Sequence, residues 1–172
     1  MAVLARDEIL KLVRSGAIKI RPFDESLVGA GSIDLHLGST FRVFRKPSNI
    51  IHVEDRVDYK TSTTVVKLKK NEHIIIQPGE LVHGVTEENI TLPSSLSGRI
   101  EGRSRFARIG LLTHVSSGFM QPGSSGKIVL EIVNLSPMTM ALHPGTKVCQ
   151  VVLEEVKGRG SYKGKFAGQI SP

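Results

Sequence analysis

The stretch Ile128-Val129-Leu130-Glu131-Ile132-Val133 is an apolar run interrupted by one carboxylate. Branched aliphatic side chains in so short a run are typical of a buried strand rather than a helix. Similar segments recur along the chain: Ile18–Ile20, Ile33–Leu37, Phe41–Phe44, Val65–Leu68, Ile74–Ile76, Leu81–Val85, Leu96–Ile100, Leu111–Val115, Met138–Leu142 and Val148–Leu153. Pro-Gly pairs, which suit tight turns between strands, occur at Pro78-Gly79, Pro122-Gly123 and Pro144-Gly145. This pattern predicts an all-β chain, either a barrel or a double-sheet jelly roll.

Three segments depart from the strand pattern. Residues 9–13 carry apolar side chains at i, i+3 and i+4 ahead of Gly16, which predicts a short N-terminal helix. Helix formers bounded by glycines predict a second short helix near 103–109, two turns long. Ser104 would lie at its start, where free N–H groups and neighbouring arginines favour an anion, although such arginines are usually just solvated. Residues 157–172 are rich in glycine and lysine, and their composition alone predicts a frayed tail.

Composition and charge narrow the class of protein. The 172 residues are enough for one domain, residues 1–172, with a full core and no disulfides. Lysine and arginine outnumber aspartate and glutamate by 23 to 16, a net charge of +7 that favours an anionic partner. Six Phe, two Tyr and no Trp leave few platforms for stacking bases, so a nucleic acid is not expected as that partner. The apolar runs are too short to cross a membrane, no secretory signal is expected, and the single cysteine, Cys149, fits a reducing cytoplasm.

Several common kinds of site are excluded by motif. The chain has neither a P-loop nor a dinucleotide-binding glycine motif, and it has no G-x-S-x-G nucleophile elbow. A zinc deaminase needs a P-C-x-x-C motif, which a chain with one cysteine cannot supply. The histidines are His36, His52, His73, His83, His114 and His143. Each stands alone in the sequence, so a surface or core position is favoured over a metal ligand, and no zinc is expected.

Glu131 is the charged residue within the run 128–133. Burial of a carboxylate costs free energy unless the carboxylate is paired, and it raises the pKa of the group. A carboxyl group in such a place is a candidate general acid and base. The alternative is an edge strand from which Glu131 points to water, and the residues alone leave both interpretations open.

A series of motifs follows in order along the chain. They are Gly31-Ser32-Ile33-Asp34-Leu35-His36-Leu37-Gly38, Leu92-Pro93, Glu101-Gly102-Arg103-Ser104-Arg105-Phe106-Ala107-Arg108-Ile109-Gly110-Leu111, Pro122-Gly123 with Gly126 and Leu130-Glu131, and Tyr162-Lys163-Gly164-Lys165-Phe166-Ala167-Gly168-Gln169. Together they resemble the dCTP deaminase family, from about residue 6 to residue 169. The resemblance implies the β fold of the trimeric dUTPases and a homotrimer with sites at subunit interfaces.

The resemblance also implies a reaction in pyrimidine deoxynucleotide metabolism. Water adds to C4 of the cytosine ring of dCTP, and ammonia leaves to give dUTP. Glu131 corresponds to the general base and acid of the family, Ser104 to the hydroxyl that helps to place the water, and Arg108 to the arginine that holds both in position. Magnesium would be carried by the triphosphate of the substrate.

The residues that correspond to nucleotide-binding positions of the family form a larger set. They are Arg103, Ser104, Arg105, Phe106, Ala107, Arg108, Gln121, Val129, Leu130, Glu131, Gln150, Tyr162, Lys165 and Gln169. By this correspondence residues 103–105 form the triphosphate-binding turn, and Val129 and Leu130 flank the base and sugar. The tail, residues 157–172, would be a lid that closes over the nucleotide.

Three positions depart from the family pattern. Arg105 replaces a serine, Gln121 replaces an aspartate, and Ser124 replaces an aromatic residue. Gly118-Phe119 and Gln150 resemble the branch that continues to dUMP and diphosphate, but Gln121 argues against that second step because an amide is not a base. The main expectation is therefore dCTP deamination to dUTP. A dUMP-forming bifunctional enzyme, a dUTPase and a non-catalytic nucleotide-binding homologue are the alternatives.

Overall fold

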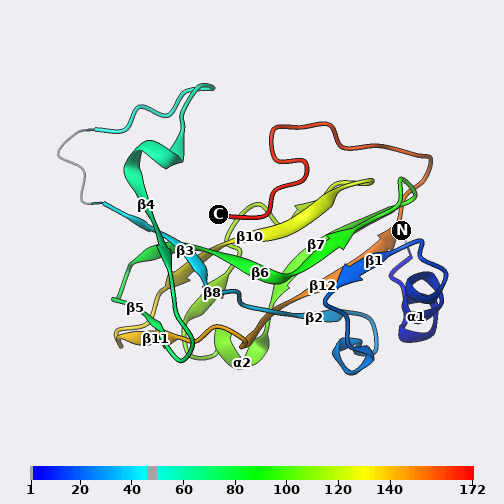
Figure 1. The fold of residues 1–172 in the computed structure, drawn as a ribbon, viewed down its shortest axis with the longest axis horizontal. Coiled ribbons are helices and arrows are strands. Elements are labelled where there is room, and N and C mark those ends of the chain that lie inside the picture. The colour runs from blue at the N-terminus through cyan, green and yellow to red at the C-terminus, as the bar shows by residue number, and fades with distance from the viewer. Residues whose placement is uncertain (1, 46–49) are drawn as a thin grey trace.

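The chain is built mainly from antiparallel strands in the residues that the computed structural model describes, 2–45 and 50–172. The strands are β1 Lys19–Arg21, β2 Ile33–His36, β3 Thr40–Phe44, β4 Thr63–Lys67, β5 Ile74–Ile76, β6 Leu81–Thr91, β7 Leu96–Gly102, β8 Leu111–Thr113, β9 Phe119–Met120, β10 Ser125–Asn134, β11 Met140–Leu142 and β12 Lys147–Glu155. Over the described ranges they form three sheets (Figure 1). The largest has the order β4-β3-β6-β10-β8 with β1 paired to β6, the second has the order β2-β12-β7-β9, and β5 pairs with β11.

The two larger sheets contribute side chains to one apolar core. Leu130 of β10 and Phe41 of β3 point inward from the six-stranded sheet and are fully buried. Leu35 of β2 and Val151 of β12 belong to the same core cluster and are also fully buried. Each such side chain contributes about 1.5–3 kcal/mol on burial. The expected all-β fold with two sheets around a core is therefore confirmed.

The strand segments predicted from the sequence all fall on or next to strands, but some bounds differ. β6 continues to Thr91, beyond the predicted end at Val85, because its polar second half pairs with both β1 and β10. β8 ends at Thr113 rather than at Val115. The short β9 has no apolar run of its own and was not predicted from the sequence; it forms because residues 119–120 pair with β7.

The Pro-Gly pairs form the predicted tight turns. Gly79, Gly123 and Gly145 have φ angles of 79°, 71° and 81°, in the left-handed region that favours glycine. In each turn the N–H of the residue after glycine donates to the carbonyl three residues earlier, as in Ser124 to Gln121 at 3.2 Å. Proline at the second position and glycine at the third are the residues that such a turn requires.

The predicted helices are present, but the second is shorter than expected. α1 spans Arg6–Arg14 and buries Ile9 on its apolar face. α2 spans only Ser104–Ala107, one turn instead of two. It ends because Gly110 has a φ of 83° and packs against Ser136, where a Cβ would lie 2.9 Å from the backbone nitrogen. Two 3-10 helices, η1 Glu25–Leu27 and η2 Tyr59–Ser62, were not predicted.

The tail is ordered, so the frayed tail predicted from composition is wrong. It runs back across the six-stranded sheet, at the upper side of Figure 1. The Tyr162 N–H donates to Pro122 O at 2.9 Å, the Gly168 N–H donates to Ser125 O at 2.9 Å, and the Lys127 N–H donates to Gln169 O at 2.8 Å. These backbone bonds fix the tail although few of its side chains are apolar. Among the described residues, no helix is both long enough and apolar enough to cross a membrane.

Candidate active site

Glu131 lies in the middle of β10, between β6 and β8, so the edge-strand interpretation is wrong. Its neighbours Leu130 and Ile132 face the core and are fully buried. Because side chains alternate along a strand, Glu131 points to the opposite face, where 28% of its side chain is exposed. A carboxylate on this face is accessible to a ligand and is only partly solvated.

His114 forms an ion pair with Glu131. Its Nδ1 lies 2.9 Å from Glu131 Oε2, and its side chain is only 6% exposed. The backbone N–H of His114 also donates a hydrogen bond of 2.8 Å to the Glu131 carbonyl, so the backbone fixes the two residues beside each other. His114 has a φ of 64°, a strained conformation for a residue other than glycine, and such strain is typically found at functional sites.

The pair shifts the pKa values of both residues. Burial by itself lowers the pKa of His114, but the nearby carboxylate of Glu131 outweighs this effect, so the pKa is raised above its ordinary value of 6.5. Burial by itself raises the pKa of Glu131, but His114, together with a weaker contribution from His83, lowers it below its ordinary value of 4.5. Glu131 is therefore ionised at neutral pH and able to accept a proton.

His83 lies on the other side of Glu131. The two residues are directly opposite each other in the pairing of β6 with β10. The His83 ring is enclosed by Phe44 and Tyr59, whose ring centroids lie 5.3 and 5.4 Å away. Burial lowers the pKa of His83, so the ring is neutral. Both histidines stand alone in the sequence. The pairing of β6 with β10 brings His83 to Glu131, and the backbone hydrogen bond of His114 brings the other.

The ion pair makes the stability of the protein depend on pH. Since the pKa of His114 is raised, its contribution to the free energy of unfolding is complete below pH 6.5. This contribution is lost as the pH rises through the pKa of His114 in the folded protein. Since the pKa of Glu131 is lowered, its contribution to the free energy of unfolding is complete above pH 4.5. This contribution is lost as the pH falls through the pKa of Glu131 in the folded protein. We expect His114→Gln to cost most in free energy of unfolding between those limits. Urea titrations of both proteins at about pH 5.5 and about pH 9 test this, and an equal cost at both would contradict it.

A second polar cluster lies at the ends of β2, β7 and β12. Arg103 Nη1 lies 3.3 Å from Asp34 Oδ2 and donates to the Lys147 carbonyl at 3.3 Å. Gln150 Oε1 accepts a hydrogen bond of 2.6 Å from Ser32 Oγ. The structure therefore brings together Arg103 and Gln150, two of the predicted binding residues. Asp34 belongs to the motif of residues 31–38 but was not predicted as a site residue.

A cavity of about 280 Å³ lies between the tail and the start of β10. Gln121 and Tyr162, both predicted binding residues, line it together with His114. Ser124 also lines it, and its hydroxyl is buried without a hydrogen-bond partner among the described atoms. The cavity therefore has polar groups on its wall and reaches the histidine that pairs with Glu131.

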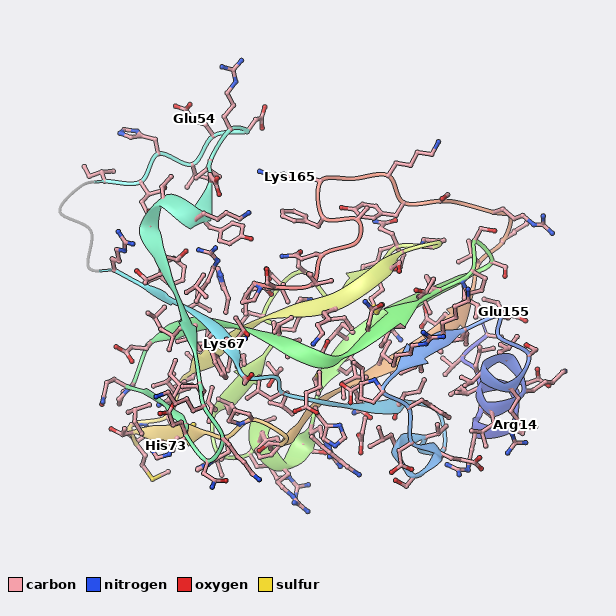
Figure 2. All side chains as sticks on the ribbon, in the orientation of Figure 1. Arg14, Glu54, Lys67, His73, Glu155 and Lys165 are labelled. Carbon is pink, nitrogen blue, oxygen red and sulfur yellow. The ribbon has the colours of Figure 1, made fainter. Side chains whose placement is uncertain are left out.

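The other predicted tail residues lie near the same face of the sheet. Figure 2 shows Lys165 on the upper arm of the tail, above β10. Lys165 and Gln169 line a further cavity of about 280 Å³, together with Tyr59 of η2 and Arg42 of β3. Val129 faces the same side as Glu131, whereas the Leu130 side chain is fully buried. Strand alternation points the Leu130 side chain into the core, so on the Glu131 face this residue offers only its backbone.

The predicted site residues in and next to α2 lie apart from Glu131 and the tail in the folded chain. Ser104, Arg105, Ala107 and Arg108 are exposed, and over residues 2–45 and 50–172 no ion pair or hydrogen bond joins their side chains to Glu131. Phe106 turns inward and lines an apolar cavity. α2 and the tail lie at opposite edges of Figure 1. One copy of the chain therefore does not bring all the predicted site residues together.

Over residues 2–45 and 50–172, no group of three or more His, Cys, Asp or Glu side chains is placed to hold a metal ion. His73 and His143 lie against each other, with ring centroids 4.9 Å apart. They form a pair without a carboxylate or cysteine that would complete such a group.

Comparison with protein families and with curated proteins gives concordant results. Residues 3–156 match the family model described as dCTP deaminase-like. The chain is 38% identical to a dUMP-forming dCTP deaminase of Corynebacterium jeikeium, over 99% of this chain and 94% of that protein. It is 37% identical to a dUMP-forming dCTP deaminase of Mycolicibacterium vanbaalenii, over 99% of this chain and 93% of that protein.

Solved structures show the same fold at low sequence identity. The 2′-deoxycytidine 5′-triphosphate deaminase of Agrobacterium tumefaciens superposes with a TM-score of 0.67 at 22% identity, over 88% of this chain. This chain spans about half of that structure, 47% of its length. A dUTPase variant of Staphylococcus bacteriophage 80alpha superposes with a TM-score of 0.52 at 10% identity, over 86% of this chain and 96% of that one.

Proposed function

The chain belongs to the dCTP deaminase-like family of enzymes, and from this premise we propose that it converts dCTP to dUMP, ammonia and diphosphate. The observation that carries the proposal is the ionised carboxylate of Glu131, which is partly exposed on β10 and flanked by His114 and His83. The main expectation from the sequence, release of dUTP, rested on Gln121. The relatives are named dUMP-forming, which favours the alternative.

In the proposed deamination, Glu131 accepts a proton from water as the oxygen bonds to C4 of the cytosine ring. That proton passes through Glu131 to N3. The proton of the new C4 hydroxyl then passes to the C4 amine, the C4–N bond breaks, ammonia leaves, and a uracil ring with a C4 carbonyl remains. General base catalysis of this kind contributes about 10²- to 10⁴-fold to a rate. The charge of His114 next to Glu131 keeps the carboxylate ionised before water arrives. A second water would then attack the α-phosphate, and diphosphate would leave.

We place the nucleotide between copies of the chain. Arg103, Ser104 and Arg108 lie around α2, at the opposite edge of the molecule from the tail. A binding site that uses both groups of residues needs α2 from one subunit and the tail from another, so the proposed enzyme is an oligomer, and the family resemblance makes it a homotrimer. Magnesium would arrive on the triphosphate of the substrate, where phosphate oxygens are its preferred ligands.

Product analysis tests this function. We expect the protein with dCTP and Mg²⁺ to form dUMP and diphosphate, separable from dUTP by ion-exchange chromatography. Accumulation of dUTP would contradict the second step and leave the deamination intact. Gln121→Asp serves as the matched variant, because a carboxylate orients and deprotonates water better than an amide does. We expect a modest gain in dUMP release, since the shorter aspartate side chain places its carboxylate about 1 Å from the position of the glutamine amide.

A further inference from the structure

Arg42 binds the end of the tail. Its Nε donates a hydrogen bond of 2.7 Å to the main-chain oxygen of Pro172, and its Nη1 donates one of 3.1 Å to Thr63 Oγ1. The guanidinium also lies over the Tyr59 ring, 5.7 Å from its centroid. Pro172 is buried against this group, although most of the tail is exposed. The planar guanidinium is therefore fixed on several sides, which makes it a rigid attachment point.

The tail reaches Arg42 by crossing β10. Glycine at position 126 permits the crossing, since a Cβ there would lie 2.5 Å from the Gln169 carbonyl oxygen. The Gly168 N–H donates to Ser125 O on one side of this point, and the Lys127 N–H donates to Gln169 O on the other. The tail is thus attached at β10 by its backbone and at β3 by Arg42.

Arg42 and Glu131 belong to one row of side chains across the sheet. Arg42 is paired with His83, and His83 is paired with Glu131. Neighbouring strands are about 4.8 Å apart, so Arg42 lies roughly 10 Å from Glu131 on the same face. The end of the tail is therefore fixed close to Glu131, although Arg42 does not touch that residue.

We propose that Arg42 is a positioning residue that holds the tail across the Glu131 face before the nucleotide binds. The inference rests on the proposed function, in which Lys165 and Gln169 of the tail bind the nucleotide. A tail already held by Arg42 loses less conformational freedom when the substrate arrives, so less binding free energy is spent on ordering it. The effect should therefore fall on KM rather than on kcat.

A double-mutant cycle tests the attachment. Arg42→Gln and truncation after Ile170 each remove one partner of the contact, and the doubly altered protein removes both. We expect each single change to raise KM for dCTP about 5- to 30-fold, with kcat within about 2-fold, and the combination to do no more than either alone. Additive effects, or an unchanged KM, would overturn the proposal. Arg45→Gln is the matched control, because the Arg45 side chain bonds Thr64 rather than the tail.

Hydrogen exchange gives a readout that does not depend on activity. Without nucleotide, we expect faster exchange of backbone amides over residues 161–170 in Arg42→Gln and in the truncated protein, with Arg45→Gln like the wild type. Unchanged exchange in both altered proteins would overturn the proposal. If Arg42→Gln fails to fold, the truncation decides alone, since it leaves the sheet intact. Faster exchange in a protein without deaminase activity would contradict the proposed function but support the attachment.

Discussion

Replacement of Glu131 by glutamine is expected to lower kcat for deamination of dCTP by at least about 100-fold. The amide has nearly the same volume as the carboxylate, so the packing of β10 is unaffected, but it cannot accept the proton of the attacking water. The wild-type carboxylate is ionised at neutral pH because its pKa is lowered, chiefly by His114. Ammonia release under saturating dCTP measures the loss. A variant with more than about a tenth of the wild-type kcat would show that Glu131 is not the general base.

Glu87→Gln is the matched control for this prediction. Glu87 is a partly buried carboxylate on β6, the strand that pairs with β10, and it has no place in the proposed mechanism. We expect its substitution to leave kcat within about 2-fold of the wild type, because the change keeps the side-chain volume and removes no group that the proposed reaction uses. Thermal unfolding of both variants separates a chemical effect from a loss of fold.

Mixing of inactive chains extends the test to the arrangement of the site. In the proposed site, Glu131 acts with Arg108 of another subunit. When Glu131→Gln chains are mixed with Arg108→Ala chains, some sites receive Glu131 from an Arg108→Ala chain and Arg108 from a Glu131→Gln chain. Such sites contain both residues intact. Recovery of activity after refolding the mixture is therefore expected. Mixed oligomers without any recovery would show that both residues act within one chain.

Local sequence signals account for most of the fold. Apolar runs such as Ile128–Val133 and the three Pro-Gly turns depend on neighbouring residues, and the structure has strands and turns at those places. β9 was missed because it has no signal of its own and depends on pairing with β7. The length of α2 was wrong because its end is set by contact of Gly110 with Ser136, a residue distant in the sequence.

The site was predicted less completely for the same physical reason. Glu131 carries a local signal, a charge within an apolar strand, whereas His83 and His114 have none. His83 lies beside Glu131 because β6 pairs with β10, and His114 lies beside it because the His114 backbone N–H bonds the Glu131 carbonyl. The tail is a further case, since its composition predicts disorder and its order comes from bonds to β10 and Arg42.

Arg103→Ala is expected to weaken dCTP binding by about 10- to 100-fold and to change deoxycytidine binding by much less. The reason is that the guanidinium is assigned to the triphosphate, and a charge-assisted contact of this kind contributes about 1.5–3 kcal/mol. Calorimetric titration of the Glu131→Gln protein, which should not turn over its ligand, gives both dissociation constants.

Loss of the ion pair between Arg103 and Asp34 could also weaken dCTP binding, and this structural effect has to be separated from loss of a phosphate contact. Arg103 lies 3.3 Å from Asp34, so its loss leaves a partly buried carboxylate without its partner and could disturb β2. Arg99→Ala is the matched control, because Arg99 lies on β7, the strand that ends directly before Arg103, and pairs with Glu154 at 2.7 Å. Loss of a structural ion pair weakens nucleotide and nucleoside alike, whereas loss of a phosphate contact weakens only the nucleotide. Equal losses for dCTP and deoxycytidine in Arg103→Ala would therefore assign Arg103 to the support of β2 and remove it from the triphosphate site.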